Sequence, residues 1–378
     1  MITEKTIAIY TAFAHKLPNA RPELLATLLN YKNRVVVLGL EGQDIGESAF
    51  RELGIQYCSI PISRHKLSVK DEIHGSDIIA RELITRKIDI LLSYGVRLVP
   101  SANNAAKKAN IPVMNIINGA GTLFVEGGVR GALLRKTIFP VLKKCFASSD
   151  KVVFQNNDDL DEFMSFKLVN RNQCGLTNGS GVNLQKYSLS DLPDEVIFGN
   201  DCRLAKEKGI GELVKAFQKL KLEFPNARLR IAGAMDGLEG TEIYSEFNDL
   251  VASHVIDYYG EITDIRGFLQ GCCCFVFPSY REGCPRSIIE AMACGRPIIT
   301  TDVPGCRETV QENENGYLVP SRNVELLYEA MKNMYRIGDE RKSMGLVSRK
   351  IAEEKFDVNS NNRIICDYLQ ECLNHHEP

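Results

Sequence analysis

Two glutamates in one short stretch are the first candidates for chemistry. Glu282 and Glu290 stand eight positions apart in PSYREGCPRSIIEAMACGRPIITTDVPG. Pro285 suits a first helical turn, where its missing N–H costs nothing, and Gly295 suits the position just past a helix end. We therefore expect a helix over about residues 285–294, directly after the apolar strand CCCFVFPS. The free N–H groups and the positive dipole end at its start would stabilise an anion such as a diphosphate.

Two cations form a second candidate group in GNDCRLAKEKGIGELV. Arg203 and Lys208 follow the expected strand VIFGN and precede a helix that opens near Ile210. Cations at the carboxyl end of a strand, beside a glycine-rich turn, suit a diphosphate without a metal ion. A charged, solvated loop is the alternative, and this segment alone does not decide between them. A surface glutamate is likewise the alternative for Glu290, although its helical neighbours are mostly apolar.

Size and composition narrow the class of protein. A chain of 378 residues is too long for one ordinary core and suits two domains. A net charge of −2 gives no global sign of nucleic-acid binding. There are 12 cysteines but no CxxC pair, and Cys272, Cys273 and Cys274 lie in an apolar run, so we expect core thiols in a reducing cytoplasm. The N-terminus lacks the features of a signal peptide, and no segment is expected to span a membrane.

Short β-branched runs alternate with helix-like segments along the whole chain. This alternation predicts parallel sheets covered by helices on both faces. The polar, turn-rich segment 183–196 is the expected break, because a fresh strand begins after it. The predicted fold is α/β, with two doubly wound Rossmann-like domains facing a cleft and sites outside the carboxyl ends of the strands. The predicted divisions are 1–188, 189–355, and a C-terminal helix and tail, 356–378, that crosses back to the first domain.

Three segments resemble glycosyltransferase family 4, whose members are retaining enzymes of the GT-B fold. They are CRLAKEKGI, FPSYREGCPRSIIEAMACGRPIITTDVPGCRETV and NGYLVP, and the resemblance spans about residues 196–336. It implies that domain 1–188 binds the acceptor and that domain 189–355 binds a nucleotide sugar. By matching position, it gives catalytic roles to Glu282, Arg203 and Lys208: Glu282 would contact hydroxyls of the donor sugar, and the two cations would hold the diphosphate. Glu290 would hold the ribose. Backbone N–H groups around Gly283 to Arg286, a stretch that also holds Cys284 and Pro285, would help to bind sugar and phosphate.

The first domain matches the family less well. The loop after its first strand, TAFAHKLPNARPELL, has no glycine, whereas family members usually have a glycine-rich loop there. His15 and Arg21 in this loop are candidates for acceptor-side contacts, although each could be an ordinary loop residue. Asn118, followed by Gly119, stands where many relatives carry a histidine or an acid. Asn118 could hydrogen-bond sugar hydroxyls or orient the acceptor, but it cannot act as a general base.

A basic, amphipathic segment occupies residues 130–146. Such a segment can lie on an anionic membrane surface, and each cation near the surface contributes about 1 kcal/mol. An ordinary helix that packs its apolar face on the sheet is the alternative. The cations are Arg130, Arg135, Lys136, Lys143 and Lys144.

Together these features predict a retaining glycosyltransferase that uses a nucleotide-diphosphate sugar. UDP-N-acetylhexosamine or UDP-hexose is the leading donor, and GDP-linked donors stay open. The resemblance implies a saccharide acceptor linked to polyprenyl diphosphate in bacterial surface-glycan or glycoprotein-glycan biosynthesis. We expect a cytoplasmic, peripheral enzyme that needs no metal or cofactor and no nucleic acid. The alternatives are another GT-B enzyme, such as a nucleotide-sugar epimerase or a sugar phosphorylase, and a non-catalytic nucleotide-sugar-binding protein.

Overall fold

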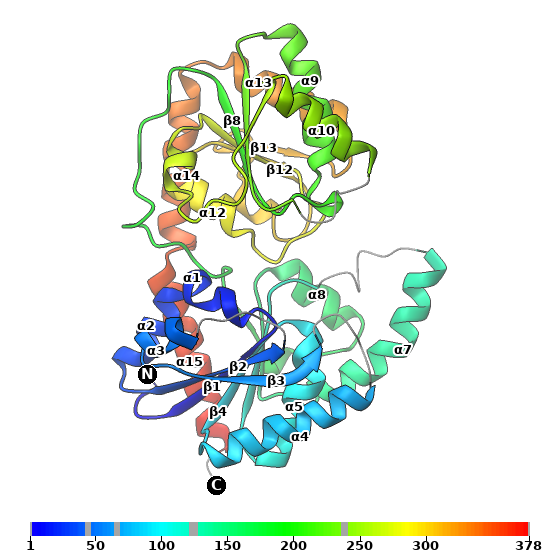
Figure 1. The fold of residues 1–378 in the computed structure, drawn as a ribbon, viewed down its shortest axis with the longest axis vertical. Helices are drawn as coiled ribbons and strands as arrows, with labels where there is room; N and C mark the ends of the chain where they lie inside the picture. The colour runs from blue at the N-terminus through cyan, green and yellow to red at the C-terminus, as the bar shows by residue number, and fades with distance from the viewer. Residues whose placement is uncertain (1, 42–46, 64–68, 121–127, 236–240, 377–378) are drawn as a thin grey trace. The chain divides into compact units, whose positions relative to one another are not determined.

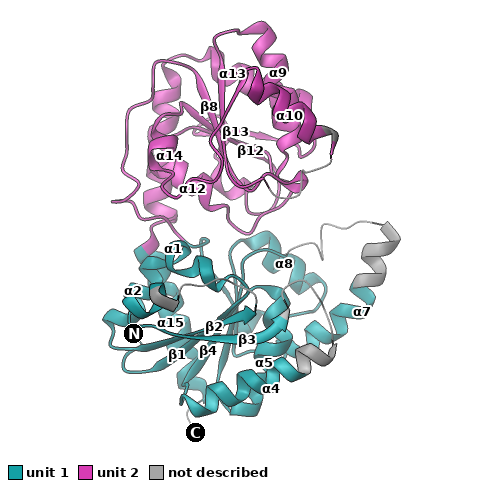
Figure 2. Cartoon of the chain, viewed as in Figure 1, with its two compact units in different colours: residues 1–180, 359–378 teal, residues 181–358 magenta. Residues whose placement is uncertain are grey.

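The computed structural model describes residues 2–41, 47–63, 69–120, 128–235 and 241–376 (Figure 1). It divides into two compact units, coloured separately in Figure 2. Unit 1 comprises Met1–Ser180 and Asn359–Pro378, and unit 2 comprises Gly181–Val358. Each unit is a parallel sheet with helices around it, so the prediction of two doubly wound α/β domains is confirmed.

The sheet of unit 1 has seven strands in the order β3-β2-β1-β4-β5-β6-β7. All of its strand pairs are parallel, because helices connect successive strands. The central strand β1 reads TIAIYT and is buried along its whole length, as expected for a strand covered on both faces. The strands are β1 Thr6–Thr11, β2 Arg34–Glu41, β3 Gln56–Ser63, β4 Ile90–Tyr94, β5 Val113–Ile117, β6 Lys151–Phe154 and β7 Cys174–Leu176.

The C-terminal helix belongs to unit 1, as predicted. Leu369 and Ile365 of this helix are buried in the same core cluster as Ile7 and Ile9 of β1. The Nζ of Lys151 in β6 lies 2.8 Å from Oε1 of Glu371. The helices of unit 1 are α1 Leu17–Ala20, α2 Pro22–Asn30, α3 Glu47–Glu52, α4 Val69–Thr85, α5 Val99–Ala109, α7 Gly128–Phe146, α8 Asn157–Ser165 and α15 Val358–His376.

The sheet of unit 2 has six strands in the order β10-β9-β8-β11-β12-β13, which places β8 beside β11. Its strands are β8 Ile197–Asp201, β9 Arg228–Ala232, β10 Ile256–Tyr258, β11 Cys274–Phe277, β12 Ile298–Thr301 and β13 Gly316–Val319. Its helices are α9 Ile210–Glu223, α10 Glu242–Ala252, α11 Arg266–Gln270, α12 Arg286–Ala293, α13 Val324–Arg336 and α14 Glu340–Lys355. Cys272, Cys273 and Cys274 are fully buried at and before β11, so their interpretation as core residues is confirmed.

The units divide at slightly different places from those predicted. The chain passes from unit 1 to unit 2 after Ser180 and returns after Val358, whereas the sequence placed these divisions after residues 188 and 355. At the crossing, the Val182 N–H donates to the Phe356 carbonyl at 2.7 Å, and the Val358 N–H donates to the Val182 carbonyl at 3.1 Å. The polar segment that follows is held inside unit 2, because the buried guanidinium of Arg296 donates to the Ser190 side chain at 2.9 Å.

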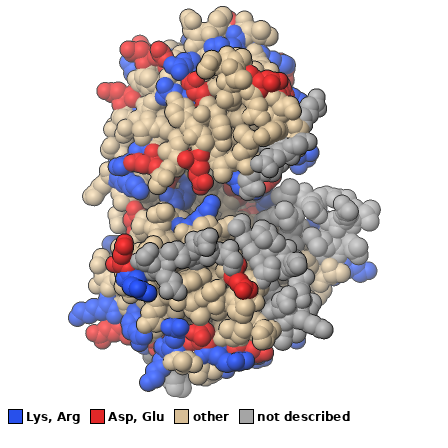
Figure 3. All heavy atoms as spheres, in the orientation of Figure 1, with Lys and Arg blue, Asp and Glu red and all other residues tan. Residues whose placement is uncertain are grey.

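Two short edge strands, β7 and β13, were not predicted as strands. They have three and four residues, too few to show a periodic pattern. Among the residues that the structure describes, no helix combines the length and apolarity needed to cross a membrane. On the face shown in Figure 3, basic and acidic side chains are interspersed over the described surface.

Candidate functional site

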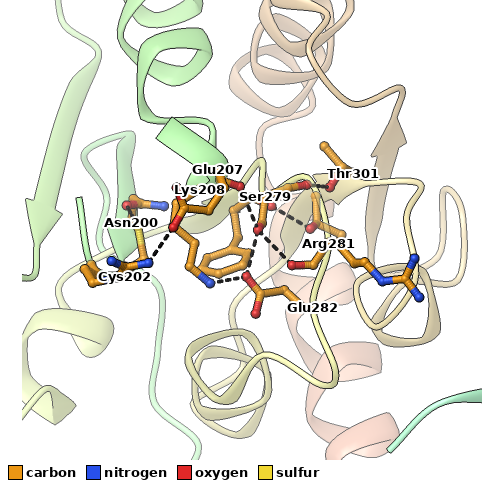
Figure 4. Close-up of polar contacts among 11 residues, drawn as sticks. Asn200, Cys202, Glu207, Lys208, Ser279, Arg281, Glu282 and Thr301 are labelled. Carbon is orange, nitrogen blue, oxygen red and sulfur yellow. Dashed lines mark hydrogen bonds and ion pairs between the residues drawn. The ribbon is translucent and has the colours of Figure 1, made fainter. Parts of the chain in front are cut away.

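The candidate site is built from two loops at the carboxyl ends of the neighbouring strands β8 and β11 (Figure 4). The first loop ends in Gly209, whose φ of +70° is a left-handed conformation, and a Cβ there would lie 2.1 Å from the Pro278 carbonyl oxygen. Only glycine allows this approach. The Tyr280 N–H donates to the Glu207 carbonyl at 2.9 Å, and the Ser279 hydroxyl oxygen lies 3.2 Å from the same carbonyl oxygen. The two loops are therefore fixed against each other.

Lys208 and Glu282 form an ion pair where these loops meet. Ser279 Oγ donates to the same carboxylate oxygen, Glu282 Oε1, at 2.7 Å. The Lys208 and Glu282 side chains are 21% and 15% exposed, so both can reach a ligand while staying in place. Burial lowers the pKa of Lys208, but the charge and hydrogen bond of Glu282 outweigh that effect and leave the pKa above its ordinary value. The site therefore holds a permanent cation beside a positioned carboxylate.

The Glu282 loop is also held from the β12 side. The Glu282 N–H donates to the Pro304 carbonyl at 3.1 Å. Gly305 has a φ of +80°, and a Cβ there would lie 2.4 Å from the Glu282 carbonyl oxygen. Gly283 is buried and Cys284 is partly buried in the same loop. This clamping fixes the backbone whose N–H groups were predicted to approach sugar and phosphate.

Helix α12 begins as predicted, with Pro285 as its N-cap and Cys294 as its C-cap. Glu290 on this helix is buried, with 6% of its surface exposed, so it is not a solvated surface glutamate. Arg286, one turn earlier, donates from Nη2 to Glu290 Oε1 at 2.6 Å. The Tyr187 hydroxyl lies close to this carboxylate: burial raises the pKa of Tyr187, and the charge and hydrogen bond of Glu290 raise it further.

Arg203 is placed differently from Lys208. Its side chain is 48% exposed and forms an ion pair with Glu207 in the same loop. The structure thus brings Lys208, Glu282, Arg286 and Glu290 into two ion pairs, and it leaves Arg203 at the exposed edge of the first loop.

Three residues of this region were missed by sequence reasoning. Ser279 hydrogen-bonds Glu282, and its place directly after the β11 strand was the available signal. Tyr187 contacts Glu290 from a segment that reads only as a polar linker. Asp201 ends strand β8, a position that favours a site residue in a parallel sheet.

In unit 1 the predicted residues come from two connections: His15 and Arg21 lie between β1 and α2, and Asn118 follows β5. His15 is in a short 3-10 helix, Ala14–Lys16, and is partly buried. The Arg21 guanidinium lies 5.5 Å from the centre of the Tyr94 ring, at the end of β4. Asn118 is exposed just after β5, followed by Gly119, and its Oδ1 would lie 3.6 Å from a Cβ built at Gly95. The roles proposed for these residues stay predictions.

The described side chains of α7 belong partly to the core. Leu142 and Phe146 are buried in a cluster with residues of β5 and β6, and Ile138 packs against it. Val141 is 52% exposed. The basic side chains Lys136, Lys143 and Lys144 are exposed, and those of residues 130–134 lie outside the described part. Core packing thus accounts for part of the apolar face, and membrane contact stays a prediction.

Groups of three or more His, Cys, Asp or Glu side chains that could hold a metal ion do not occur among the described residues. Asp159 and Asp161 form an Asp-x-Asp pattern in α8 of unit 1. Asp159 is fully buried and its Oδ2 accepts a hydrogen bond from Asn156 at 3.1 Å, whereas Asp161 is exposed. The expectation that no metal is needed stays a prediction.

Comparisons with known proteins show similarity to glycosyltransferases. The family model for "Glycosyl transferases group 1" matches residues 191–350, which lie within unit 2. A Campylobacter jejuni relative is 25% identical over 356 residues, covering 90% of this chain and 91% of that protein. Its name is N,N'-diacetylbacillosaminyl-diphospho-undecaprenol alpha-1,3-N-acetylgalactosaminyltransferase. The chain is a glycosyltransferase.

Further relatives of the glycosyltransferase include the Staphylococcus aureus capsular polysaccharide biosynthesis glycosyltransferase CapM, 27% identical over 210 residues, which covers 53% of this chain and 54% of that protein. A solved glycosyltransferase from Rickettsia africae has the same fold, with a TM-score of 0.79, 19% identity and coverage of 98% of this chain and 99% of that one. Anabaena HepE, solved with UDP and glucose, has a TM-score of 0.77, 16% identity and coverage of 97% and 99%. The predicted GT-B fold of the glycosyltransferase is confirmed.

Proposed function

We propose that the glycosyltransferase moves a sugar from UDP-N-acetylhexosamine or UDP-hexose to a saccharide linked to polyprenyl diphosphate, with retention of anomeric configuration, in bacterial glycan biosynthesis. The use of a nucleotide-sugar donor is supported by two ion pairs, Lys208–Glu282 and Arg286–Glu290, at the strand ends of unit 2. The C. jejuni relative is named for an acceptor on diphospho-undecaprenol and for transfer of N-acetylgalactosamine, which supports the acceptor and sugar classes.

Lys208 is the group proposed to stabilise the leaving diphosphate. Its ammonium has three N–H donors, and one of them is used by Glu282. The remaining donors can bind phosphate oxygens without breaking the ion pair, so the cation needs no reorganisation as negative charge grows on the leaving group. Removing one such preorganised donor commonly costs about 10²–10³ in kcat. Arg203 would add a second cation by exchanging Glu207 for phosphate.

Glu282 is proposed to position the sugar rather than to attack it. Lys208 and Ser279 both donate to Oε1, and no hydrogen bond from the described residues reaches Oε2. Oε2 can therefore accept a sugar hydroxyl, while the ion pair lowers the nucleophilicity of the carboxylate. This arrangement favours a same-face substitution through an oxocarbenium-like state over a covalent glycosyl-enzyme on Glu282.

The test is an assay of the purified chain with UDP-GlcNAc, UDP-GalNAc, UDP-Glc, UDP-Gal and GDP-Man against a polyprenyl-diphosphate-linked sugar. We expect nucleoside diphosphate release that depends on the acceptor, and an NMR coupling constant showing that the product keeps the donor's anomeric configuration. Epimerised nucleotide sugar without acceptor would indicate the epimerase instead. Nucleotide binding without any turnover of donor would indicate a non-catalytic binding protein. Full activity in excess EDTA is expected if no metal takes part.

Peripheral membrane contact through α7 is a further part of the proposal. Its exposed lysines would contact vesicles of phosphatidylglycerol and phosphatidylethanolamine, each contributing about 1 kcal/mol. Replacing Lys136, Lys143 and Lys144 with Gln should reduce vesicle sedimentation while leaving transfer to a soluble acceptor unchanged. A matched control replaces Lys342 and Lys350, whose side chains are 64% and 71% exposed on unit 2. Equal vesicle binding by both sets of variants would contradict membrane docking through α7.

A further inference from the structure

Tyr280 lies two residues before Glu282 in the loop after β11, and none of the roles above uses its side chain. Its hydroxyl donates to Oε1 of Glu212 at 2.7 Å, a length typical of a hydrogen bond from a hydroxyl to a carboxylate. Glu212 belongs to the first turn of α9, four positions after Lys208. The Tyr280 side chain therefore joins the loop that carries Glu282 to the helix that begins just after Lys208.

The backbone of Tyr280 contacts the chain on the other side of Lys208. The Tyr280 N–H donates at 2.9 Å to the carbonyl of Glu207, the residue directly before Lys208. Figure 4 shows Glu207 and Lys208 beside the loop that carries Glu282. One residue of the second loop thus holds the chain both before and after Lys208. Removing the Tyr280 hydroxyl alone would release the α9 end and leave the backbone hydrogen bond in place.

The Tyr280 ring is held from a third direction. The guanidinium carbon of Arg322, which follows β13, lies 4.5 Å from the centre of the ring, within the range of a cation–π contact. Burial raises the pKa of Tyr280, and the hydrogen bond and charge of Glu212 raise it further, while Arg322 opposes the shift. The hydroxyl therefore keeps its proton at neutral pH and stays a donor to Glu212.

We propose that Tyr280 is a positioning residue for sugar transfer: by bonding Glu212, it keeps Lys208 in register with the second loop. This rests on the proposed function, in which Lys208 faces the leaving diphosphate and Glu282 positions the sugar. The two groups act on opposite sides of the bond that breaks, so their spacing matters most in the transition state. An error of about 1 Å in the position of such a group can reduce a rate about a hundredfold. Nucleotide binding, which also uses the contacts of α12, should change much less.

A purely structural role is the alternative, and α9 offers a direct comparison. The hydroxyl of Tyr328 in α13 donates to Glu223, the last residue of α9. The same two chemical groups thus join α9 to a neighbouring segment at each end, and the ends of this 14-residue helix are about 20 Å apart. Of the two tyrosines, Tyr280 is the one beside Lys208. If both hydrogen bonds serve only the fold, their loss should affect the reaction equally.

The experiment compares Tyr280→Phe with Tyr328→Phe in the acceptor-dependent release of nucleoside diphosphate, with the donor and acceptor that the wild-type chain turns over. Calorimetry with the released nucleotide, UDP or GDP, gives its dissociation constant. Tyr280→Phe should lower kcat about tenfold or more and change the dissociation constant less than about threefold, because the contact acts mainly in the transition state. Tyr328→Phe should leave both constants near those of the wild-type chain.

Variants of Glu212 test the same hydrogen bond from its other side. Glu212→Ala should lower kcat as much as Tyr280→Phe does, whereas Glu212→Gln keeps an oxygen acceptor and should retain most of kcat. The double variant Tyr280→Phe/Glu212→Ala should be no slower than either single variant, because each removes the same bond. Thermal unfolding shows which variants are folded. If Tyr280→Phe does not fold, the comparison of Glu212→Ala with Glu212→Gln decides the question.

Three results would overturn the role of Tyr280 alone: a wild-type kcat in Tyr280→Phe, equal losses of kcat in Tyr280→Phe and Tyr328→Phe, or losses that multiply in the double variant. A wild-type chain that releases no nucleoside diphosphate in the presence of any acceptor would instead overturn the proposed function, and the role of Tyr280 with it.

Discussion

The two units share a sheet topology but differ in what their strand ends carry. In unit 2, the loops after β8 and β11 are tied by backbone hydrogen bonds and by the close approach of Gly209 to Pro278, and they present paired charges. In unit 1, the loop after β1 forms a short 3-10 helix and α1 in place of a glycine-rich turn. Its predicted residues are a histidine and an arginine in this connection and an asparagine after β5.

Under the proposed function, this difference would separate the donor side of the reaction from the acceptor side. In the proposed function, the ion pairs of unit 2 would supply the charge, fixed in place before the reaction, that a leaving diphosphate needs. The candidates in unit 1 are suited to hydrogen-bonding a neutral saccharide. Substitutions in the two units should therefore affect different kinetic constants, and that expectation can be tested.

The largest effect is expected for Lys208→Ala. Loss of the cation that faces the leaving diphosphate should reduce kcat by about a hundredfold or more. The acceptor-dependent release of nucleoside diphosphate measures this change. Lys206→Ala is the matched control, because Lys206 is exposed in the same loop. A folded Lys208→Ala variant with near-normal kcat would contradict a catalytic role for Lys208.

An intermediate effect is expected for Glu290→Ala. The variant removes a charged acceptor and leaves Arg286 without this partner, so the affinity for nucleotide should fall about tenfold, since hydrogen bonds to charged groups contribute about 1.5–3 kcal/mol. Isothermal titration with UDP measures it. Glu325→Gln serves as the control, because the Glu325 side chain is 60% exposed. If both variants bind UDP equally well, Glu290 does not contact the nucleotide.

A smaller effect is expected in unit 1 for Asn118→Ala. One neutral hydrogen bond contributes about 1 kcal/mol, so the KM for the acceptor should rise about fivefold. The dissociation constant for UDP should not change, and steady-state kinetics with both substrates varied separates the two. If the variant alters the affinity for UDP and leaves the acceptor KM unchanged, Asn118 acts on the donor side. That result would contradict the assignment of donor and acceptor to different units.

The smallest effect concerns stability and pH. The pKa of Asp201 is raised by folding to about 7, so the folded state holds its proton more tightly than the unfolded chain. The wild-type chain therefore loses stability as pH rises from about 4 to about 7, and the cost is fully present above pH 7. Because Asp201→Asn lacks this cost, its melting temperature at pH 8 should be a few °C above that of the wild-type chain, which corresponds to ~1 kcal/mol in a domain of this size. At pH 4 the two melting temperatures should be nearly equal. Circular dichroism melts at both pH values measure the difference. A constant offset between the two proteins would contradict it.

Local chemistry made parts of this structure predictable. The two ends of α12 can be predicted from Pro285, its N-cap, and from Gly295, which follows its C-cap, and the strands can be predicted from their β-branched runs. The Lys208–Glu282 pair spans 74 positions and depends on β8 lying beside β11, so no local pattern predicts it apart from the family resemblance. The environment of Asp201 also depends on tertiary structure, because the charge of Glu290 that acts on it comes from α12. The family resemblance aligns Arg203 with a residue type, but it does not show that Glu207 pairs with Arg203 in the absence of a ligand. The exposed position of Arg203 was therefore not predicted.

The chain crosses between the units twice, and both crossings meet at Val182. This arrangement affects how unit 2 can be separated from the rest of the enzyme. Because Val182 hydrogen-bonds both Phe356 and Val358, residues 181–358 are one uninterrupted insert whose two ends are already joined side by side. Closing a chain whose ends meet costs little entropy, so this insert is suited to excision, circular permutation and grafting as a single piece. If residues 181–358 hold the donor as proposed, exchanging the segment between Ser180 and Asn359 for that of a relative should change the donor, while the rest of the chain keeps its acceptor.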